Sequence, residues 1–381
     1  MRICFLSSGH PIHDKRVFDK EATSLAAAGF EVVYLTAGEE GSTRDQGVEV
    51  ITYMLHPSIL GRLFQIPRLY RLGSRLNADC YHCNEVDSWI AGVFLKLLRR
   101  RKIVFDVHED YPSTFAESRF PRPLRPLVAG IIRLLYRALA PLTDRFVLAK
   151  HCIAHDFRHA QSKVLVVANY TPLTYADRQP PPPDARPWGN SGLTAIHLGL
   201  IGRLRGWPQL LEALARARNK SIHLHVIGTF NDNSRADFGR RVAELGLQDR
   251  VTFEEWLPFA EAYERVLASD IGLVLFQPGV QNHVYALPHK MFDYMMSRLP
   301  VIAPAFAEEV AAIIREADCG LLIDPSDPEQ IAQALDRLAD DPDERRRLGE
   351  NGRRAVRERY NWEAEAAKLV GMYRELAGVK P

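Results

Sequence analysis

The chain has 381 residues, more than one ordinary domain needs, so two domains are expected. Apolar residues make up 46% and charged residues 25%, which excludes a disordered, collagen-like or coiled-coil chain. The 49 basic and 47 acidic residues leave a net charge of +2, so no global basic field for nucleic acid is present.

The five cysteines are odd in number and scattered, which argues against a disulfide framework and favours a reducing, cytoplasmic compartment. Cys80 and Cys83 form one C-x-x-C pair, but no second pair completes a metal site, so both are expected in a buried strand end. The first apolar run is too short for a signal peptide. No apolar run reaches the length of a membrane-spanning helix, so none is predicted.

The first part of the chain alternates apolar runs with amphipathic stretches. A helix is predicted over 14–28. Strands are predicted over 3–7, 31–36, 48–53, 80–83, 102–107, 144–148 and 163–167. Continuous buried strands that alternate with helices indicate a parallel sheet covered on both faces.

Four consecutive prolines at 180–183 interrupt this alternation, because they can join neither a ladder nor a helix. We therefore place a linker over 171–192. The alternation then resumes. Strands are predicted over 193–198, 222–227, 251–253, 271–275, 301–303 and 320–323, and helices over 208–217, 235–245, 259–268, 288–297, 310–317, 328–359 (two helices) and 362–376. This pattern predicts two doubly wound α/β domains that face a cleft.

The glycine-rich loops lack the dinucleotide and P-loop spacings. The first strand is followed by a single glycine, Gly9, and the loop 199–206 has its glycines at other spacings. This second loop joins a strand to a helix and carries Arg203 and Arg205. These arginines and the amides at the helix start could hold a diphosphate, although a solvated basic turn is the alternative.

The segment 282–303 carries the most specific pattern in the chain. A polar loop leads into a helix at Pro288, on which Lys290 and Asp293 stand one turn apart. A carboxylate near a helix start can accept two ribose hydroxyls while a lysine faces phosphate. An ordinary ion pair within the helix is the alternative.

Three segments together resemble the retaining glycosyltransferases of family 4, which have the GT-B fold. Residues 288–303 resemble the signature P-x-K-x-[FL]-E-Y-M-[AS]-x-G-x-P-V-[IV]-A, residues 13–32 resemble D-x-R-V-x-x-E-A-x-x-L-A-x-x-G-H-x-V, and residues 105–112 resemble D-x-H-E-x-Y-P. The resemblance implies an acceptor-binding domain at 1–170, a nucleotide-sugar-binding domain at 193–360, and a helix at 361–381 that packs back on the first domain.

The resemblance also implies a donor site in the second domain. Arg203 and Arg205 correspond to the family's basic pair for the diphosphate, with Lys290 beside them, and Asp293 corresponds to its ribose-binding Glu. Eight positions before Asp293 the family has a second Glu, where this chain has Tyr285. The amides around Leu287 could still contact the sugar and phosphate.

In the first domain, His108 corresponds to the family's active-site histidine, and Gly9 to its loop near the phosphate and acceptor. The family's retaining mechanism uses no protein nucleophile, so His108 is expected to position the sugar. Glu109 or Asp110 could face the acceptor, with loop capping as the alternative. The D-x-D at 341–343 precedes a helix and is expected to cap it. The resemblance therefore implies transfer without a metal or other cofactor.

Two Arg-rich stretches predict contact with an anionic membrane. The first, 62–75, contains Arg62, Arg68, Arg71 and Arg75, and the second, 121–140, contains Arg122, Arg125, Arg133 and Arg137. Ordinary packing helices with arginines that reach water are the alternative. Such contact suits a lipid-linked saccharide acceptor on the inner face of the cytoplasmic membrane.

The sequence thus predicts a glycosyltransferase that moves a sugar from a UDP- or GDP-linked donor to a glycan or lipid-linked saccharide in bacterial cell-surface polysaccharide or lipopolysaccharide assembly. Two alternatives stay open: a nucleotide-sugar 2-epimerase of the same fold, and a scaffold that binds nucleotide without transfer.

Overall fold

The computed structural model describes residues 1–54, 59–181 and 192–379, apart from the side chains of 59–64 and 175. It divides the chain into two compact units. The first comprises Met1–Asn169 and Trp362–Pro381, and the second comprises Tyr170–Asn361. The described part of the predicted linker, 171–181, therefore belongs to the second unit. Prolines 182 and 183 lie outside the described residues.

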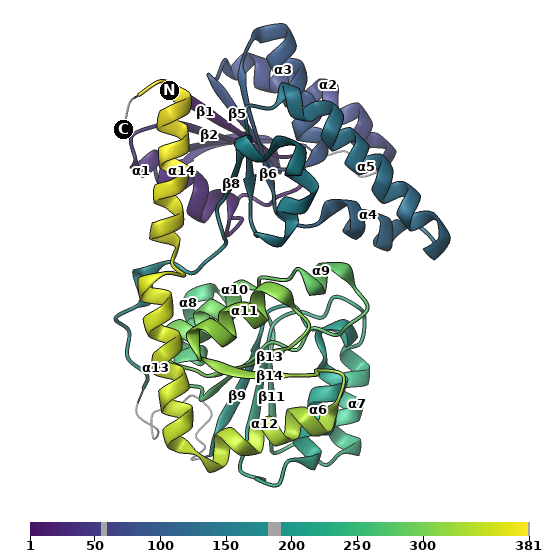
Figure 1. Cartoon of the computed structure of the whole chain (residues 1–381), viewed down its shortest axis with the longest axis vertical. Helices are drawn as coiled ribbons and strands as arrows, with labels where there is room; N and C mark the ends of the chain where they lie inside the picture. Colours follow the sequence, from purple (N-terminus) through teal and green to yellow (C-terminus); the bar gives the residue numbers. More distant parts are fainter. Residues whose placement is uncertain (55–58, 182–191, 380–381) are drawn as a thin grey trace. The chain divides into compact units, whose positions relative to one another are not determined.

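The first unit contains an eight-stranded sheet in the order β3-β4-β2-β1-β5-β6-β7-β8 (Figure 1). Its strands are β1 (Arg2–Leu6), β2 (Glu31–Ala37), β3 (Gly41–Asp45), β4 (Val48–Tyr53), β5 (Cys80–Cys83), β6 (Lys102–Val107), β7 (Arg145–Leu148) and β8 (Val164–Val166). All pairs are parallel except β3 with β4. The predicted strands are confirmed within one or two residues. Strand β3 was not predicted, because it is a mostly exposed polar edge strand without an apolar run.

Helices cover both faces of this sheet. On one face lie α2 (Ile59–Leu76), α3 (Val86–Arg99) and α5 (Arg125–Leu139), whose apolar side chains share a core with β1, β5, β6 and β7. Within this core, Trp89 of α3 stacks on Phe105 at 4.1 Å and meets Tyr136 of α5 edge-on. The other face is covered by a π-helical turn (Val17–Ala22), α1 (Thr23–Ala27) and α14 (Trp362–Ala377).

The last helix, α14, is part of the first unit although it follows the second unit in sequence. Its buried residues Leu369, Met372 and Tyr373 join the core beneath β1 and β5. The Trp362 indole donates to Ser24 Oγ at 2.9 Å, and Glu365 accepts from the Ala168 amide at 2.9 Å. Apolar packing and side-chain hydrogen bonds thus hold the chain's last helix in this unit.

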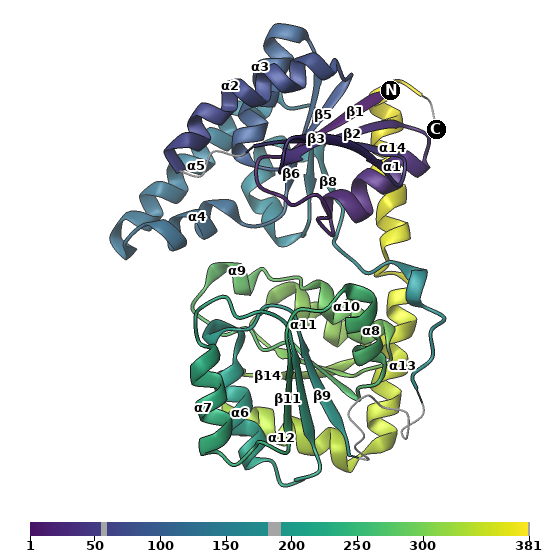
Figure 2. The same cartoon turned by 180° about the vertical axis from the view of Figure 1, so that it is seen from behind.

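The second unit contains a parallel six-stranded sheet in the order β11-β10-β9-β12-β13-β14 (Figure 2). Its strands are β9 (Thr194–Leu198), β10 (His223–Ile227), β11 (Val251–Glu254), β12 (Ile271–Leu273), β13 (Val301–Pro304) and β14 (Gly320–Ile323). Its helices are α6 (Trp207–Arg216), α7 (Arg235–Glu244), α8 (Phe259–Leu267), α9 (Gln281–Val284), α10 (His289–Met296), α11 (Glu308–Ala317), α12 (Pro328–Asp340) and α13 (Pro342–Glu358). Helix α10 lies so close to β12 that a Cβ at Gly272 would stand 2.4 Å from the Tyr294 ring.

Two further expectations are confirmed. Cys80 and Cys83 are free and buried in β5. Asp341 caps α13 by accepting from the Glu344 amide at 2.8 Å, so the D-x-D begins a helix as expected. Within the described ranges, no helix combines the length and apolar character needed to cross a membrane.

Candidate functional site

In the second unit, basic side chains converge near the carboxyl end of β9. Lys290 of α10 extends its ammonium nitrogen to 3.5 Å from Nε2 of His197. The Arg205 guanidinium lies over the Phe276 ring at 4.8 Å, and Lys290 lies 5.9 Å from the same ring. Burial, with a contribution from the Arg205 charge, lowers the pKa of Lys290 to about 7. Burial, followed by the Lys290 charge, also lowers the pKa of His197 well below its usual value.

Arg203 lies apart from these groups. It stands with Arg205 on one short 3₁₀ turn, Arg203–Arg205. Its guanidinium pairs with Asp237 of α7 and lies 5.5 Å from the Trp207 ring centre. Its backbone amide donates to Asp232 at 2.6 Å. Of the predicted basic pair, therefore, Arg205 lies at the same aromatic ring as Lys290, whereas Arg203 pairs with an acidic side chain.

Gly206 closes this turn with a φ of +84°, a left-handed conformation that favours glycine. A Cβ there would lie 2.4 Å from the Leu275 carbonyl oxygen. The glycine thus lets the loop that carries Arg205 approach the chain just beyond β12.

The predicted ribose ligand, Asp293, is almost fully buried and already has partners within its own unit. Oδ1 accepts from the Thr171 hydroxyl at 2.8 Å, and Oδ2 lies 2.9 Å from Nδ1 of His289. Asp293 and Lys290 therefore have separate partners, instead of forming the ion pair considered as the alternative. His289, which the sequence analysis did not select, is the more exposed member of this group.

The other two predicted donor residues lie just before α10. Tyr285 ends the short helix α9 and is partly buried. Leu287 is buried with Ala286, and the Ala286 amide donates to the His283 carbonyl at 3.3 Å. That amide is thus engaged within the loop itself.

In the first unit, a pocket of about 210 Å³ lies at the carboxyl ends of β5 and β6. His10 and His108 both line it, with their ring centres 4.7 Å apart. Burial alone would lower the pKa of His10, but its hydrogen bond with Asp14 and the charge of Glu85 raise it. Of His10 and His108, only His108 was a predicted site residue.

Gly9, predicted to lie near a phosphate, has its backbone amide engaged by Glu85. The Glu85 carboxylate accepts from the amides of Ser8 at 2.9 Å and Gly9 at 2.8 Å, and from the Ser7 hydroxyl at 2.7 Å. The backbone amides that could have bound a phosphate thus already donate to the Glu85 carboxylate.

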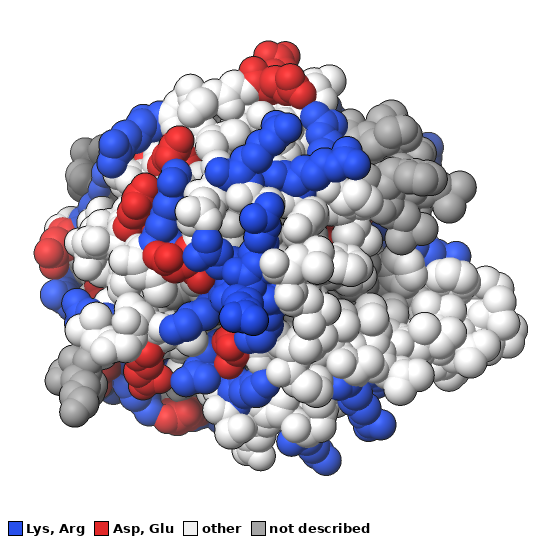
Figure 3. Space-filling model, turned by 90° about the horizontal axis from the view of Figure 1, so that it is seen from above, with Lys and Arg blue, Asp and Glu red and all other residues white. Residues whose placement is uncertain are grey.

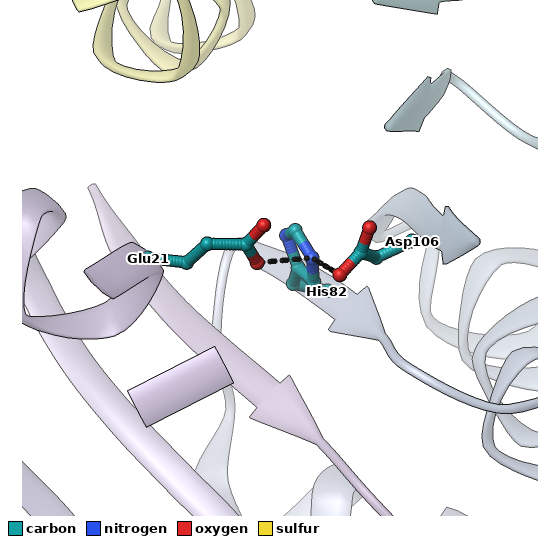
Figure 4. A group of neighbouring side chains, drawn as sticks. All are labelled: Glu21, His82 and Asp106. Carbon is teal, nitrogen blue, oxygen red and sulfur yellow. Dashed lines mark ion pairs between the residues drawn. The ribbon is translucent and has the colours of Figure 1, made fainter. Parts of the chain in front are cut away.

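His108 contacts a buried ionic cluster formed by Arg16, Glu21, His82 and Asp106. Its Nε2 pairs with Oδ2 of Asp106. The Arg16 guanidinium lies 2.9 Å from both Asp106 and Glu21. His82 lies between the two carboxylates, 3.3 Å from Glu21 and 3.6 Å from Asp106 (Figure 4).

Charges within the cluster set its protonation. Burial opposes ionisation, yet the Arg16 and His108 charges hold the pKa of Asp106 well below its usual range. Burial alone would lower the pKa of His82, but hydrogen bonds to Asp106 and Glu21 raise it to about 9. Ligand atoms of Glu21, His82 and Asp106 lie within 4.8 Å of one another, a spacing that could hold a metal ion. In this arrangement Arg16 and protonated His82 already balance the two carboxylates.

The remaining predicted catalytic residues differ in environment. Glu109 is exposed and lines the pocket. Asp110 is 1% exposed, and neither carboxylate oxygen has a hydrogen-bond partner among the described residues. Asp110 precedes α4 (Tyr111–Arg119) without capping it through its side chain, so the capping alternative is wrong for this residue.

Comparison with known proteins identifies glycosyltransferase domains in both halves. Residues 187–355 match the family model of the glycosyl transferases group 1, and residues 15–175 match that of Glycosyltransferase Family 4. Alpha-D-kanosaminyltransferase of Streptomyces kanamyceticus is 24% identical over 84% of this chain and 82% of its own length. The MMP alpha-(1->4)-mannosyltransferase of Mycolicibacterium hassiacum is 29% identical over 45% of this chain, and the match spans 40% of that protein.

Solved structures confirm the GT-B fold. HepE from Anabaena in complex with UDP superimposes with a TM-score of 0.76 at 14% identity, over 98% of this chain and all of HepE. WaaG, a glycosyltransferase involved in lipopolysaccharide biosynthesis, gives 0.67 at 18% identity over 98% of this chain and 99% of WaaG.

Proposed function

Because both halves of the chain match glycosyltransferase families, we propose that the protein is a retaining glycosyltransferase of family 4. It takes a sugar from a nucleotide-diphosphate donor, UDP- or GDP-linked, to a saccharide or lipid-linked acceptor in cell-surface polysaccharide assembly. The second unit binds the donor, and the first binds the acceptor.

The observation that carries this proposal is the pairing of Arg205 with Lys290 beside His197. Two cationic groups near one strand end suit a diphosphate, whose charge grows as the bond to the sugar breaks. A lysine whose pKa is about 7 gains most from such an anion, since the anion's charge stabilises its protonated form. The proposed transfer uses these cations in place of a metal ion.

An exposed apolar surface on α5 supports a lipid-linked acceptor. Leu127, Ile131 and Leu134 form one stripe along this helix and are 63%, 58% and 64% exposed. Figure 3 shows a face on which Lys and Arg side chains crowd beside a broad uncharged area. Exposed apolar residues next to basic ones are typical of a helix that lies on an anionic bilayer. We therefore place the protein at the inner face of the cytoplasmic membrane.

The arginines of these stretches contribute unequally. Arg122 and Arg137 near or on α5, and Arg71 and Arg75 on α2, are exposed. Three other arginines are engaged within the protein. Arg133 pairs with Asp156 at 2.8 Å, and Arg68 pairs with Glu40 at 3.0 Å. Arg125 donates to the carbonyls of Phe120 and Glu117. The side chain of Arg62 lies outside the described residues. The membrane proposal therefore rests on the four exposed arginines.

Thermal-shift measurements with UDP, GDP, ADP, CMP and dTDP test the donor assignment. A ligand that binds only the folded chain raises its melting temperature. We expect one diphosphate to do so in the wild type and not in Lys290→Ala/Arg205→Ala. Product analysis with the matching nucleotide sugar then separates transfer, which needs an acceptor, from epimerisation, which alters the donor alone. Absence of any shift would overturn the donor site.

A further inference from the structure

The pocket in the first unit contains polar groups that the fold leaves without partners. Asn84 follows β5 and is 5% exposed, yet neither its amide nitrogen nor its carbonyl oxygen has a hydrogen-bond partner among the described residues. The Tyr136 hydroxyl, at 1% exposed, also lacks one. Both side chains line the pocket. Buried polar groups normally find partners, so three unmatched atoms at one cavity point to a ligand that supplies them.

The chemistry of these atoms defines that ligand. An amide offers two N–H donors and an acceptor, and a phenol hydroxyl both donates and accepts. A ring that bears several hydroxyls, each also a donor and an acceptor, matches this set. The volume of about 210 Å³ has room for one sugar ring and not for a nucleotide.

The charges around the pocket disfavour an anionic ring. Among the described residues, its lining contains the carboxylates of Glu85, Asp106 and Glu109 and the imidazoles of His10 and His108, but no lysine or arginine. Phosphate-binding sites are rich in arginine, lysine and unengaged backbone amides. Here the amides of Ser8 and Gly9 already donate to Glu85. A phosphate or carboxylate on the bound ring would therefore lie near Glu85 and Glu109, with only the His10 and His108 rings to offset its charge.

The pocket is lined by the helices that the proposed lipid-linked acceptor would approach. Tyr111 on α4 and Tyr136 on α5 both line it, and α5 also carries the exposed stripe Leu127, Ile131 and Leu134. A saccharide whose lipid lies in the bilayer beneath that stripe would present its sugars near these helices.

We propose that this pocket binds an uncharged sugar ring of the acceptor through the Asn84 amide and the Tyr136 hydroxyl. The pocket rejects a ring that carries phosphate. This inference rests on the proposed glycosyltransferase function and adds the class of acceptor, a neutral hydroxylated ring.

Saturation-transfer NMR on the full-length chain tests the inference. The probes are the methyl pyranosides of glucose, galactose, mannose and N-acetylglucosamine, and myo-inositol, each compared with its monophosphate. We expect saturation transfer to at least one neutral ring, and this transfer should persist in the presence of the nucleoside diphosphate found by thermal shift. Saturation transfer to the phosphate ester of the same ring should be at least fivefold weaker. These measurements need only the wild type. The inference would be overturned if no neutral ring bound, or if the phosphate ester bound as well as the neutral ring.

Two tyrosine variants separate binding from stability. Tyr136→Phe removes a hydroxyl that has no hydrogen-bond partner among the described residues, so the melting temperature should not fall while ring binding weakens at least fivefold. Tyr81→Phe removes an equally buried hydroxyl that donates to the Gly73 carbonyl at 2.7 Å, so it should lower the melting temperature and leave ring binding unchanged. Unchanged ring binding in Tyr136→Phe would contradict the inference. Should that variant not fold, Asn84→Ala takes its place under the same criteria. Nucleotide binding without ring binding would overturn only this inference and leave the donor proposal intact.

Discussion

Nζ of Lys290 and Nε2 of His197 lie 3.5 Å apart in the second unit, although both nitrogen atoms belong to basic side chains. Nε2 of His197 also lies 3.2 Å from the Leu200 carbonyl oxygen, which can only accept a hydrogen bond. That geometry favours a hydrogen on Nε2, so this nitrogen cannot take one from Lys290. His197 therefore does not stabilise the charge of the Lys290 ammonium, and a bound anion would do so.

Diphosphate binding should depend on the protonation of Lys290. Its pKa of about 7 in the free protein means that the lysine loses its charge as pH rises, and a bound diphosphate would keep it protonated. Affinity should therefore fall about fivefold from pH 7 to 8. Isothermal titration with the diphosphate found by thermal shift measures this. Lys290→Arg, which stays charged, should remove the dependence, and an equally steep decline in that variant would contradict this role of Lys290.

The two arginines of the predicted basic pair should differ in their effects. Arg205 shares the Phe276 ring with Lys290, whereas Arg203 pairs with Asp237. Arg205→Ala should weaken diphosphate binding by at least tenfold, about 1.4 kcal/mol, and Arg203→Ala by a smaller factor. Parallel titrations of the two variants provide matched controls, because both lie on the same 3₁₀ turn. A larger loss in Arg203→Ala would show that the guanidinium of Arg203 leaves Asp237 when ligand binds.

The stripe on α5 should determine membrane binding. Ile131→Glu places a carboxylate at the middle of the three exposed apolar residues, which should abolish flotation with phosphatidylglycerol vesicles. Because Ile131 is 58% exposed, the melting temperature should stay within a degree or two. Leu200→Glu, at a residue of the second unit that is 52% exposed, is the control and should float as the wild type does. Flotation of Ile131→Glu with anionic vesicles would contradict the role of the stripe, and equal flotation of the wild type with neutral and anionic vesicles would refute the electrostatic contribution.

The strands were predictable because local apolar runs define them. β4, β5 and β6 begin and end where the runs 48–53, 80–83 and 102–107 predicted. The ionic cluster was not predictable, because Glu21, His82 and Asp106 come from three elements that only the assembled sheet brings together (Figure 4). A signal existed nonetheless: His82 and Asp106 are polar residues inside otherwise buried strands, where a charge requires a partner.

The partners of the donor-site residues could not be predicted from the sequence either. The spacing of Lys290 and Asp293 correctly placed both on one helix, yet their contacts, His197 and Thr171, lie on segments far away in sequence. Helical periodicity predicts which residues share a face of a helix, but it does not predict which residues of other elements contact that face. For the same reason, no local pattern could distinguish Arg203 from Arg205.

His82 should stabilise the first unit most at low pH. Its pKa is raised from 6.5 to about 9 by folding, so its contribution is complete below pH 6.5 and is lost as pH rises through 9. His82→Gln should therefore be less stable than the wild type at pH 6, by an amount on the order of 3 kcal/mol, and the difference should shrink toward pH 9.5.

Urea unfolding at several pH values measures this difference. His151→Gln is the control, because His151 is exposed, and should show a small difference at every pH. A gap between the wild type and His82→Gln that stays constant from pH 6 to 9.5 would show that His82 is uncharged in the folded protein.

Asp106 should fix the tautomer of His108. A carboxylate that is held ionised can only accept a hydrogen bond, so Nε2 of His108 must carry a hydrogen, and of the two ring nitrogens only Nδ1 can act as an acceptor. Long-range ¹⁵N–¹H NMR of histidine-labelled protein should show this tautomer for His108, with its signals assigned by their loss in His108→Gln. The measurement needs no substrate and tests the wild type directly.

Asp106→Asn supplies the second arm of this test. An amide in place of the carboxylate can donate as well as accept, so it should allow both tautomers of His108 and lower the turnover of the donor sugar more than it raises KM. The variant also leaves Arg16 and His82 facing Glu21 with one anion fewer, so it should be less stable. Tyr373→Phe controls for stability, because it removes the 2.6 Å contact to Nδ1 of His82 without touching Asp106. If the wild type carries the hydrogen on Nδ1 of His108, or if Asp106→Asn keeps the wild-type tautomer, the carboxylate does not orient the ring.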